Sequence, residues 1–323
     1  MQSTGIEKRY DRWKGQTAMN KQRRILAFAP ALTTLQTDTE HTSYRFGVGG
    51  SGSLTAVSLS RSGLDCLHCA QTGADDAGEI LRRIYAKNEV STRFLHADKE
   101  DHTTLQVVRR GAEKTQRDEF PMQHTQLSRA QVESAFTCLP DAVYCEDTQK
   151  PEVLKHIFAL AEKHNCPVLF RATTGRAAQF FKDGENTGKQ IRVLLADERE
   201  AAALTGSNTY SISNLAIKLS ICISASYYVI NFGRRGIYLY DGMHTRELYP
   251  SEMREGGEAV TCMAAFSGAF AAEYLRTQNA AQACLFANFA QALAARHAEG
   301  GVEALPYLSQ VRAHILKLAS HRA

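Results

Sequence analysis

The sequence predicts an α/β protein in which a mostly parallel central sheet is covered by helices on both faces. Apolar runs of strand length alternate with segments of helical periodicity along most of the chain. Such alternation is typical of a parallel sheet, because parallel neighbours need a crossover connection that a helix supplies. The chain shows neither an internal repeat nor a convincing linker, so we expect one domain in three α/β/α layers.

The first expected strand is residues 24–29 (RILAFA), an apolar run that follows a polar segment. Further strands are expected at residues 44–46, 65–70, 104–108, 142–145, 168–171, 192–195 and 227–232. Helices are expected at residues 53–61, 78–88, 151–164, 198–205, 213–219, 264–275, 280–297 and 308–319. Residues 237–240 and 246–249 predict a hairpin, because the pair Asp241-Gly242 between them readily adopts the positive φ of tight turns.

The main domain is expected to span residues 25–323 and to carry a small β lid. Residues 33–42 are polar and rich in Thr, so we expect a connection there rather than a strand. Lid elements are expected near residues 33–46 and 103–120. Residues 1–24 are polar and mixed in charge, which predicts a flexible or loosely docked leader.

Composition and charge argue against several classes of partner. The 38 Lys+Arg and 34 Asp+Glu residues give a net charge of +4, and the basic residues are scattered, which argues against nucleic acid as the main partner. No apolar run reaches the ~18 residues of a membrane span. The eight cysteines lie in apolar stretches, which favours reduced core thiols and a cytoplasmic protein. The segment Cys66-Leu-His-Cys69 resembles a redox or zinc half-site, but no second Cys/His pair lies nearby.

A glycine-rich segment, Gly49-Gly50-Ser51-Gly52, precedes the first expected helix. Backbone N–H groups at a helix N-terminus suit a phosphate or a closely approached sugar hydroxyl. Close packing of the helix on the sheet is the alternative interpretation. The segment is not a Walker loop, because no Gly-Lys-Ser/Thr follows it.

Three later segments carry polar side chains at expected strand-to-helix or strand-to-turn junctions. In residues 72–78 (TGADDAG), Asp75 or Asp76 can cap a helix. Residues 197–200 (DERE) follow a strand and can either cap a helix or hold Mg²⁺ through water. Residues 231–236 (NFGRRG) form either a turn against a nucleotide or a tight structural connection.

Taken in order, these segments resemble the ribokinase-like (PfkB-type) carbohydrate kinases, and 2-keto-3-deoxygluconate kinases look like the nearest branch. The resemblance covers residues 25 to 315 and implies ATP and Mg²⁺ as cofactors and a sugar or sugar acid as ligand. It places Gly49, Gly50 and the position of Leu54 on the sugar side. The residues that it places on the nucleotide side are Asp197, Glu200, Asn231, Gly233 and Gly268, with Glu200 at the metal.

The family's catalytic signature is changed in this sequence. In the family, a Gly-Ala-Gly-Asp segment supplies an aspartate base and backbone amides that stabilise the transferring phosphoryl group. The matching residues 258–264 (EAVTCMA) put Ala264 at the base position and Thr261 and Met263 at glycine positions. On the sugar side, the family's Asn falls at Leu54 and its Asp near Thr33 or Thr34.

These departures predict a catalytically impaired, pseudokinase-like homologue that still binds a nucleotide or a sugar. The alternative is an active ATP-dependent kinase acting on a sugar or sugar acid hydroxyl, with a displaced base such as Glu258 or Asp197. A homodimer through exposed lid strands is compatible with either function. The basic residues Arg109, Arg110, Lys114 and Arg117 in the lid region fit an anionic ligand or a solvated face.

Overall fold

The structure is a computed structural model that describes most of the chain. It describes residues 22–37, 40, 42–110, 115–120, 126–173, 177, 180–181, 191–207, 211–243, 246–249, 251–253 and 257–322. The expected leader, residues 1–24, lies outside these ranges except for its last three residues.

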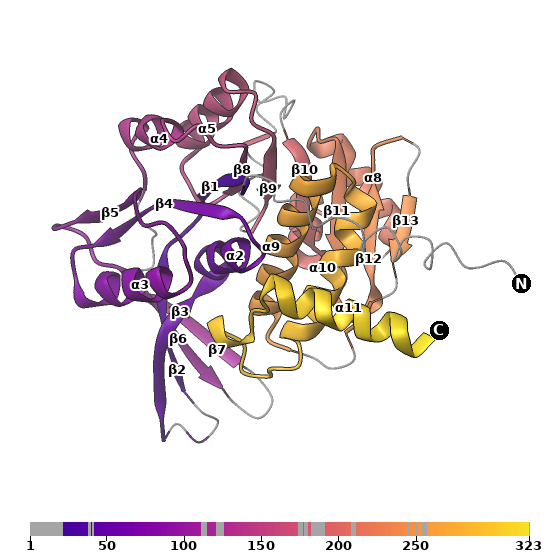
Figure 1. The fold of residues 1–323 in the computed structure, drawn as a ribbon. Helices are drawn as coiled ribbons and strands as arrows, with labels where there is room; N and C mark the ends of the chain where they lie inside the picture. Colours follow the sequence, from indigo (N-terminus) through magenta and orange to yellow (C-terminus); the bar gives the residue numbers. More distant parts are fainter. Residues whose placement is uncertain are drawn as a thin grey trace, which may run out of the picture.

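A large sheet forms the centre of the molecule (Figure 1). Among the described residues it has nine strands in the order β13-β12-β11-β10-β9-β8-β1-β4-β5. Seven strands run parallel, namely β1 (Arg24–Phe28), β4 (Asp65–Gly73), β5 (Leu95–Asp98), β8 (Ala142–Glu146), β9 (Val168–Arg171), β10 (Ile191–Asp197) and β11 (Tyr227–Asn231). The predicted hairpin is present as the antiparallel strands β12 (Ile237–Tyr240) and β13 (Arg246–Tyr249).

Each face of this sheet is buried under its own helices, because successive side chains of a strand point to opposite faces. In β1, Ile25 and Ala27 join one apolar core, and Leu26 and Phe28 join the other. The first core includes α2 (Gly50–Arg61), α3 (Asp76–Lys87), α9 (Ala259–Thr277), α10 (Ala280–Ala294) and α11 (Leu308–Arg322). The second includes α4 (Arg129–Phe136), α5 (Pro151–Lys163), α7 (Glu198–Thr205) and α8 (Ile212–Cys222). The predicted three-layer α/β/α fold is confirmed.

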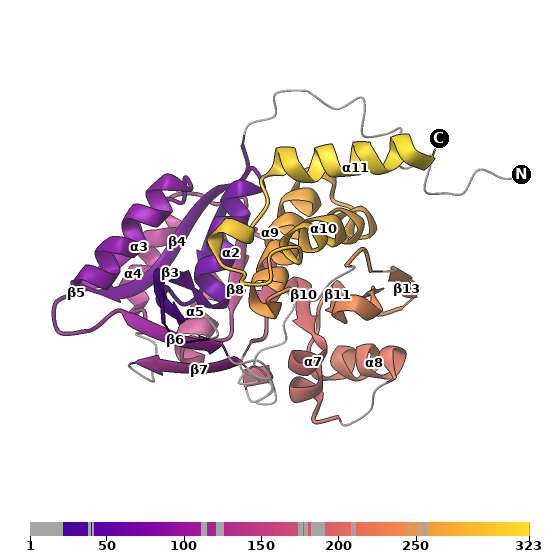
Figure 2. The same ribbon diagram turned by 90° about the horizontal axis from the view of Figure 1, so that it is seen from below.

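A small second sheet projects from the large one beside α2 and α3 (Figures 1 and 2). Its strands, in spatial order, are β3 (Tyr44–Gly49), β2 (Leu32–Thr37), β6 (Thr104–Arg110) and β7 (Thr115–Phe120). A connection without a strand was expected at residues 33–42, but β2 occupies part of this range and pairs with β3 and β6. The Thr hydroxyls of β2 donate to carbonyls of β6, which explains how a polar run is accommodated in a strand. The role of this sheet as a lid stays a prediction.

Two helices, α2 and α9, begin three or more residues earlier than the sequence predicts. Helix α2 begins at Gly50 instead of residue 53, and Gly50 has a positive φ of 71° that glycine adopts readily. Helix α9 begins at Ala259 instead of residue 264, because the Glu258 side chain caps it. Short 3-10 turns occur at Gly233–Arg235 and Val302–Ala304.

No helix in the described part of the chain combines the length and apolar character needed to cross a membrane. The eight cysteines are free, and all except Cys222 are buried. Cys66 and Cys69 lie on β4 within the cores, and burial raises the pKa of both thiols. The interpretation of this segment as core thiols is confirmed, and no group of metal-ligating side chains is found among the described residues.

Candidate functional site

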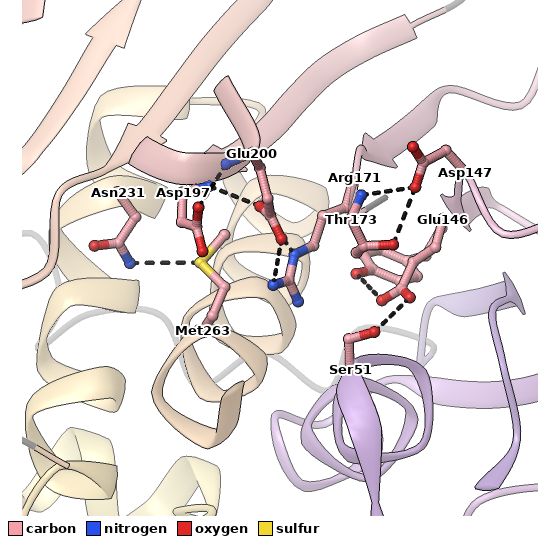
Figure 3. Close-up of polar contacts among 10 residues, drawn as sticks. Ser51, Glu146, Asp147, Arg171, Thr173, Asp197, Glu200, Asn231 and Met263 are labelled. Atoms are coloured by element: carbon pink, nitrogen blue, oxygen red, sulfur yellow. Dashed lines mark hydrogen bonds and ion pairs between the residues drawn. The ribbon is translucent and has the colours of Figure 1, made fainter. Parts of the chain in front are cut away.

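Polar side chains gather at the carboxyl edge of the large sheet (Figure 3). The pairing register places Glu146 of β8 opposite Arg171 of β9, and Asp197 of β10 opposite Asn231 of β11. All four residues end their strands, so they line one edge of the sheet. In open α/β sheets, ligands bind outside this edge.

A cavity of about 310 Å³ opens at the ends of β10 and β11. We call it the strand-end cavity, lined by Asp197, Glu198, Arg199, Asn231, Phe232, Gly233, Arg234, Met253, Gly257, Ala259, Cys262, Met263 and Gln291. Three residues expected on the nucleotide side, Asp197, Asn231 and Gly233, therefore meet at one cavity. Their role in nucleotide binding stays a prediction.

Asn231 lines the strand-end cavity, and hydrogen bonds hold its side chain in place. Its Oδ1 accepts from the Gly233 amide at 2.8 Å, and its Nδ2 donates to Gln291 Oε1 at 2.6 Å. Nδ2 also approaches the Met263 sulfur at 3.6 Å (Figure 3). Gly233 has a φ of 59°, and open space surrounds the position of a Cβ there, so the glycine serves the turn rather than packing.

Glu200 is held by two sets of bonds. It forms a capping box with Asp197, in which Asp197 Oδ1 accepts from the Glu200 amide at 2.8 Å and Glu200 Oε2 accepts from the Asp197 amide at 2.7 Å. Arg171 Nη2 donates to Glu200 Oε1 at 2.9 Å. The capping interpretation of residues 197–200 is confirmed, and these donors already satisfy the carboxylate that was expected to hold Mg²⁺.

The charges around Arg171 are almost fully withdrawn from solvent. The side chains of Arg171 and Glu200 are 4% and 10% exposed. Burial disfavours the guanidinium cation, but the carboxylates of Glu200 and Glu146 outweigh this cost and raise the pKa of Arg171. The cation is therefore permanent, and one of its nitrogens, Nη1, has no hydrogen-bond partner in the described part of the chain.

Glu146 is a second buried carboxyl group at this edge. Ser51 Oγ donates to its Oε2 at 2.7 Å, and Tyr144 Oη donates to its Oε1 at 3.0 Å. Burial raises the pKa of Glu146 to about 7, although Arg171 and these two hydroxyls oppose the shift. Ser51 comes from the glycine-rich segment, so this segment is joined to the carboxyl edge.

A second cavity, of about 360 Å³, lies between the small sheet and the first turns of α2 and α9. We call it the lid cavity, and its walls include Thr34, Gln36, Arg45, Phe46, Gly49, Gly50, Leu54, Arg61, Lys87, Gln106, Arg117, Glu258, Thr261, Glu303 and Tyr307. The three residues expected on the sugar side, Gly49, Gly50 and Leu54, all line it. A Cβ at Gly49 would lie 2.6 Å from Thr34 Cβ, so close packing on β2 also requires this glycine.

The N-terminus of α9 stands between the two cavities. Glu258, Val260 and Thr261 line the lid cavity, whereas Ala259, Cys262 and Met263 line the strand-end cavity. The cavities share no lining residue within the described ranges.

The side chain of Glu258 caps the N-terminus of α9. Glu258 Oε2 accepts from both the amide and the hydroxyl of Thr261 at 2.7 Å, and the Cys262 amide donates to the Glu258 carbonyl at 3.0 Å. Glu258 also forms an ion pair with Arg117 of β7. Because α9 begins at Ala259, the amides beyond Thr261 belong to the helical ladder and are not free to bind an anion.

Ala264, at the expected base position, is fully buried in the first core beside Phe266. Its methyl side chain has no proton acceptor, and Ala264 lies buried in the second turn of α9. No carboxylate other than Glu258, Glu303, Asp197 and Glu198 lines either cavity among the described residues.

Comparison with known proteins assigns the family. The sequence profile of the pfkB family carbohydrate kinases matches residues 24–306. The chain belongs to the pfkB carbohydrate kinase family. No curated protein matches it significantly by sequence.

Solved structures described as ribokinases and fructokinases share the fold over almost their full length. Ribokinase of Arabidopsis thaliana, solved with ribose and ATP, has a TM-score of 0.76 at 14% identity and covers 93% of this chain and 99% of its own. A fructokinase double mutant of Vibrio cholerae, solved with fructose, ADP and potassium ion, has a TM-score of 0.77 at 18% identity and covers 92% and 100%. An E. coli protein described as a ribokinase II, solved with ATP and Mg²⁺, has a TM-score of 0.76 at 14% identity and covers 91% and 99%. Structural similarity at these sequence identities shows that the chain has the ribokinase-like fold.

Two further residues of the family's motifs, Gly268 and Asp75, contact other parts of the protein. Gly268, expected to bind cofactor, lies where α9 crosses α2, and a Cβ there would meet Ser58 Oγ at 2.3 Å, so close packing requires this glycine. It lines neither cavity. Asp75 caps α3 by accepting from the Gly78 amide at 2.9 Å and from Thr103 Oγ1 at 2.6 Å, which confirms its capping role.

Glu146 and Arg171 were not among the site residues expected from the sequence. A signal was present, because each is a charged residue that ends an apolar strand, in AVYCE and VLFR respectively. At the carboxyl edge of a parallel sheet, such a position faces the ligand region.

Proposed function

We propose that this pfkB-family protein binds a nucleotide in the strand-end cavity and a sugar or sugar acid in the lid cavity but transfers phosphate slowly or not at all. The observation that carries the proposal is the N-terminus of α9, where Ala264 is buried and Glu258 caps the helix. The missing base and the Glu258 cap on the Thr261 amide remove two separate contributions to phosphoryl transfer.

The missing base alone lowers the rate substantially. General acid–base catalysis typically contributes 10²- to 10⁴-fold, so we expect turnover reduced by about that factor or more. The Glu258 carboxylate occupies the positive end of the α9 dipole, where an incoming anion would otherwise be stabilised. A phosphoryl group at this place would have to displace a charge of its own sign.

The residues present do not fit Mg²⁺ at Glu200. Magnesium demands near-octahedral oxygen coordination and takes it from one or two free carboxylates with several waters. Both oxygens of Glu200 already accept hydrogen bonds, from Arg171 and from the Asp197 amide. Asp197 borders the strand-end cavity, but its Oδ1 is committed to the cap.

The experiment is a coupled assay of ADP formation with ATP and Mg²⁺ against a panel of sugars and sugar acids, including 2-keto-3-deoxygluconate. We expect no turnover above the background of ATP hydrolysis. Thermal unfolding with ADP provides the second readout, because a ligand at 100 times its Kd adds about 2.7 kcal/mol to the free energy of unfolding. Robust sugar-dependent turnover would contradict the proposal.

An active kinase with a displaced base is the second candidate, and one observation favours it. The Glu258 carboxylate borders the lid cavity, where a sugar hydroxyl would lie. Its present bonds to Arg117 and Thr261 would have to be exchanged for the hydroxyl. If this candidate is right, wild-type protein turns over and Glu258→Gln lowers kcat by about 10²- to 10⁴-fold while Glu303→Gln, in the same cavity, does not.

We also propose that two copies of the chain associate through the small sheet. Tyr44 and Phe120, on the two edge strands of this sheet, are 62% and 54% exposed. Unpaired edges and exposed aromatic side chains are suited to pairing with another copy. Light scattering after size exclusion tests this, and a monomer at high concentration excludes it. A cytoplasmic location and the leader also stay predictions.

A further inference from the structure

Two arginines line the strand-end cavity from neighbouring elements. Arg199 is the second residue of α7, and Arg234 lies in the short turn that follows β11. Strands β10 and β11 end side by side, because Asp197 pairs with Asn231 in the parallel register. Adjacent strands lie about 4.8 Å apart. Two long side chains that start just beyond these strand ends can therefore converge on one group in the cavity.

The turn that carries Arg234 is fixed by hydrogen bonds. The Phe232 amide donates to the Gly236 carbonyl at 2.9 Å, and the Gly233 amide donates to Asn231 Oδ1 at 2.8 Å. The backbone of Arg234 is therefore held at the wall of the cavity, whereas the residue is exposed to solvent. Only a side chain has to be ordered when a ligand binds, which keeps the conformational cost of binding small.

The next residue, Arg235, is engaged elsewhere. It forms an ion pair with Glu198 of α7, and its Cζ lies 5.2 Å from the centre of the Phe232 ring. It does not line the strand-end cavity. Arg199 and Arg234, by contrast, line the cavity and have neither an ion-pair nor a hydrogen-bond partner within the described ranges. Two cations therefore remain available to a ligand.

The charges around the strand-end cavity favour an anionic ligand. Asp197 and Glu198 are the carboxylates among its described lining residues. Glu198 is neutralised by Arg235, and Asp197 Oδ1 accepts from the Glu200 amide as the cap of α7. Three arginines, with Arg235 included, therefore stand against two carboxylates. An excess of positive charge in a cleft attracts anions.

Guanidinium groups suit phosphate in particular, because their planar fork matches phosphate oxygens. The N-terminus of α9 is less suited, since Glu258 Oε2 already accepts from the Thr261 amide there. The same cavity also offers an apolar surface to the nucleoside part, because Phe232 and Met263 line it. The strand-end cavity thus combines an apolar wall with two unpaired cations.

We propose that Arg199 and Arg234 hold the phosphate groups of the nucleotide in the strand-end cavity, so that the protein selects a nucleotide over its nucleoside. This inference rests on the nucleotide binding put forward under Proposed function. It adds that side-chain cations of α7 and of the turn after β11, rather than the amides of α9, bind the phosphates. The phosphates are then held apart from the buried Ala264.

The first test is calorimetric titration of the full chain with ADP and with adenosine in one buffer. We expect ADP to bind at least about tenfold more tightly, because adenosine lacks the groups that the two arginines bind. Adenosine that binds within twofold of ADP overturns this inference and leaves binding in the cavity intact. Absence of binding by both ligands overturns the inference and the nucleotide part of the proposed function together.

The variants test the two arginines directly. In Arg199→Gln and in Arg234→Gln we expect the Kd of ADP to rise about tenfold, the value of one charge-assisted hydrogen bond. The Kd of adenosine should stay unchanged in both, which a merely structural role would not explain. Arg234→Lys keeps the charge and loses the fork, so we expect a smaller rise of about threefold.

The matched control is Arg192→Gln, which removes an exposed arginine from the opposite end of β10 and leaves both Kd values unchanged. Circular dichroism establishes that each variant is folded before binding is measured. If Arg199→Gln/Arg234→Gln binds ADP within twofold of the wild-type chain, the inference is wrong, whereas nucleotide binding itself stands. Equal losses for ADP and adenosine in the double variant also contradict it, because they would show a general disturbance of the cavity.

Discussion

Two ion pairs of the protein join the same kinds of charge in opposite surroundings. Arg171–Glu200, at the carboxyl edge, has side chains only 4% and 10% exposed. Arg45–Glu299, which joins β3 to the chain beyond α10, has side chains 60% exposed on both partners. The first pair is part of a fixed interior, and the second is screened by water. The buried pair therefore constrains the carboxyl edge, whereas the exposed pair constrains its surroundings little.

The largest expected effect comes from breaking the buried pair. Arg171→Gln leaves the Glu200 carboxylate buried without its cation, and we expect the free energy of unfolding to fall by about 3–5 kcal/mol. Urea denaturation measures this loss. In the double variant Arg171→Gln/Glu200→Gln, we expect most of the loss to be recovered. A single variant as stable as wild type would show that the interior is not constrained by this pair.

The buried carboxyl group of Glu146 makes the free energy of unfolding depend on pH. Burial raises its pKa from the usual 4.5 to about 7, so the folded state binds this proton more tightly than the unfolded state. The stabilisation is complete below pH 4.5 and is lost as pH rises through about 7. We expect this group to lower the free energy of unfolding by about 3 kcal/mol across that window.

Urea midpoints measured between about pH 4 and pH 8 test the Glu146 prediction. Other carboxyl groups titrate at the acid end, so the comparison that counts is with Glu146→Gln. We expect the variant to lack the additional fall in stability toward pH 8. Identical pH profiles for the two proteins would contradict the raised pKa.

A smaller effect is expected at the cap of α9. Glu258→Ala removes the acceptor of the Thr261 amide and hydroxyl, and we expect a loss of about 1 kcal/mol. Arg117→Gln, which removes only the ion-pair partner, is the matched control and should cost less. Equal losses in urea denaturation would show that the ion pair with Arg117, and not the cap, accounts for the effect of Glu258.

The smallest effect is expected at the exposed pair. Arg45→Gln removes a charge that is largely solvated, so we expect a change below about 0.5 kcal/mol in the free energy of unfolding. Salt provides the check, because added NaCl weakens exposed pairs and leaves buried pairs almost unaffected. A loss comparable to that of Arg171→Gln would refute the contrast between the two ion pairs.

The missed elements show where sequence patterns are weakest. Strand β2 was expected to be a connection because its Thr residues are polar, yet their hydroxyls bond across to β6, far along the chain. Helix α4 was not expected at all, although Ser128 and Gln131 form a capping box at its start. Short elements that depend on distant partners carry little periodicity of their own.

Local hydrophobic pattern and motif order were enough to predict the alternation of strands and helices, the family and the buried thiols. The family resemblance also grouped Asp197, Asn231 and Gly233, and these residues line one cavity. The pairing of Arg171 with Glu200 and the capping of α9 by Glu258 became visible only in the folded chain. Those contacts join residues on separate elements or depend on where a helix begins, and burial rather than sequence spacing sets their strength.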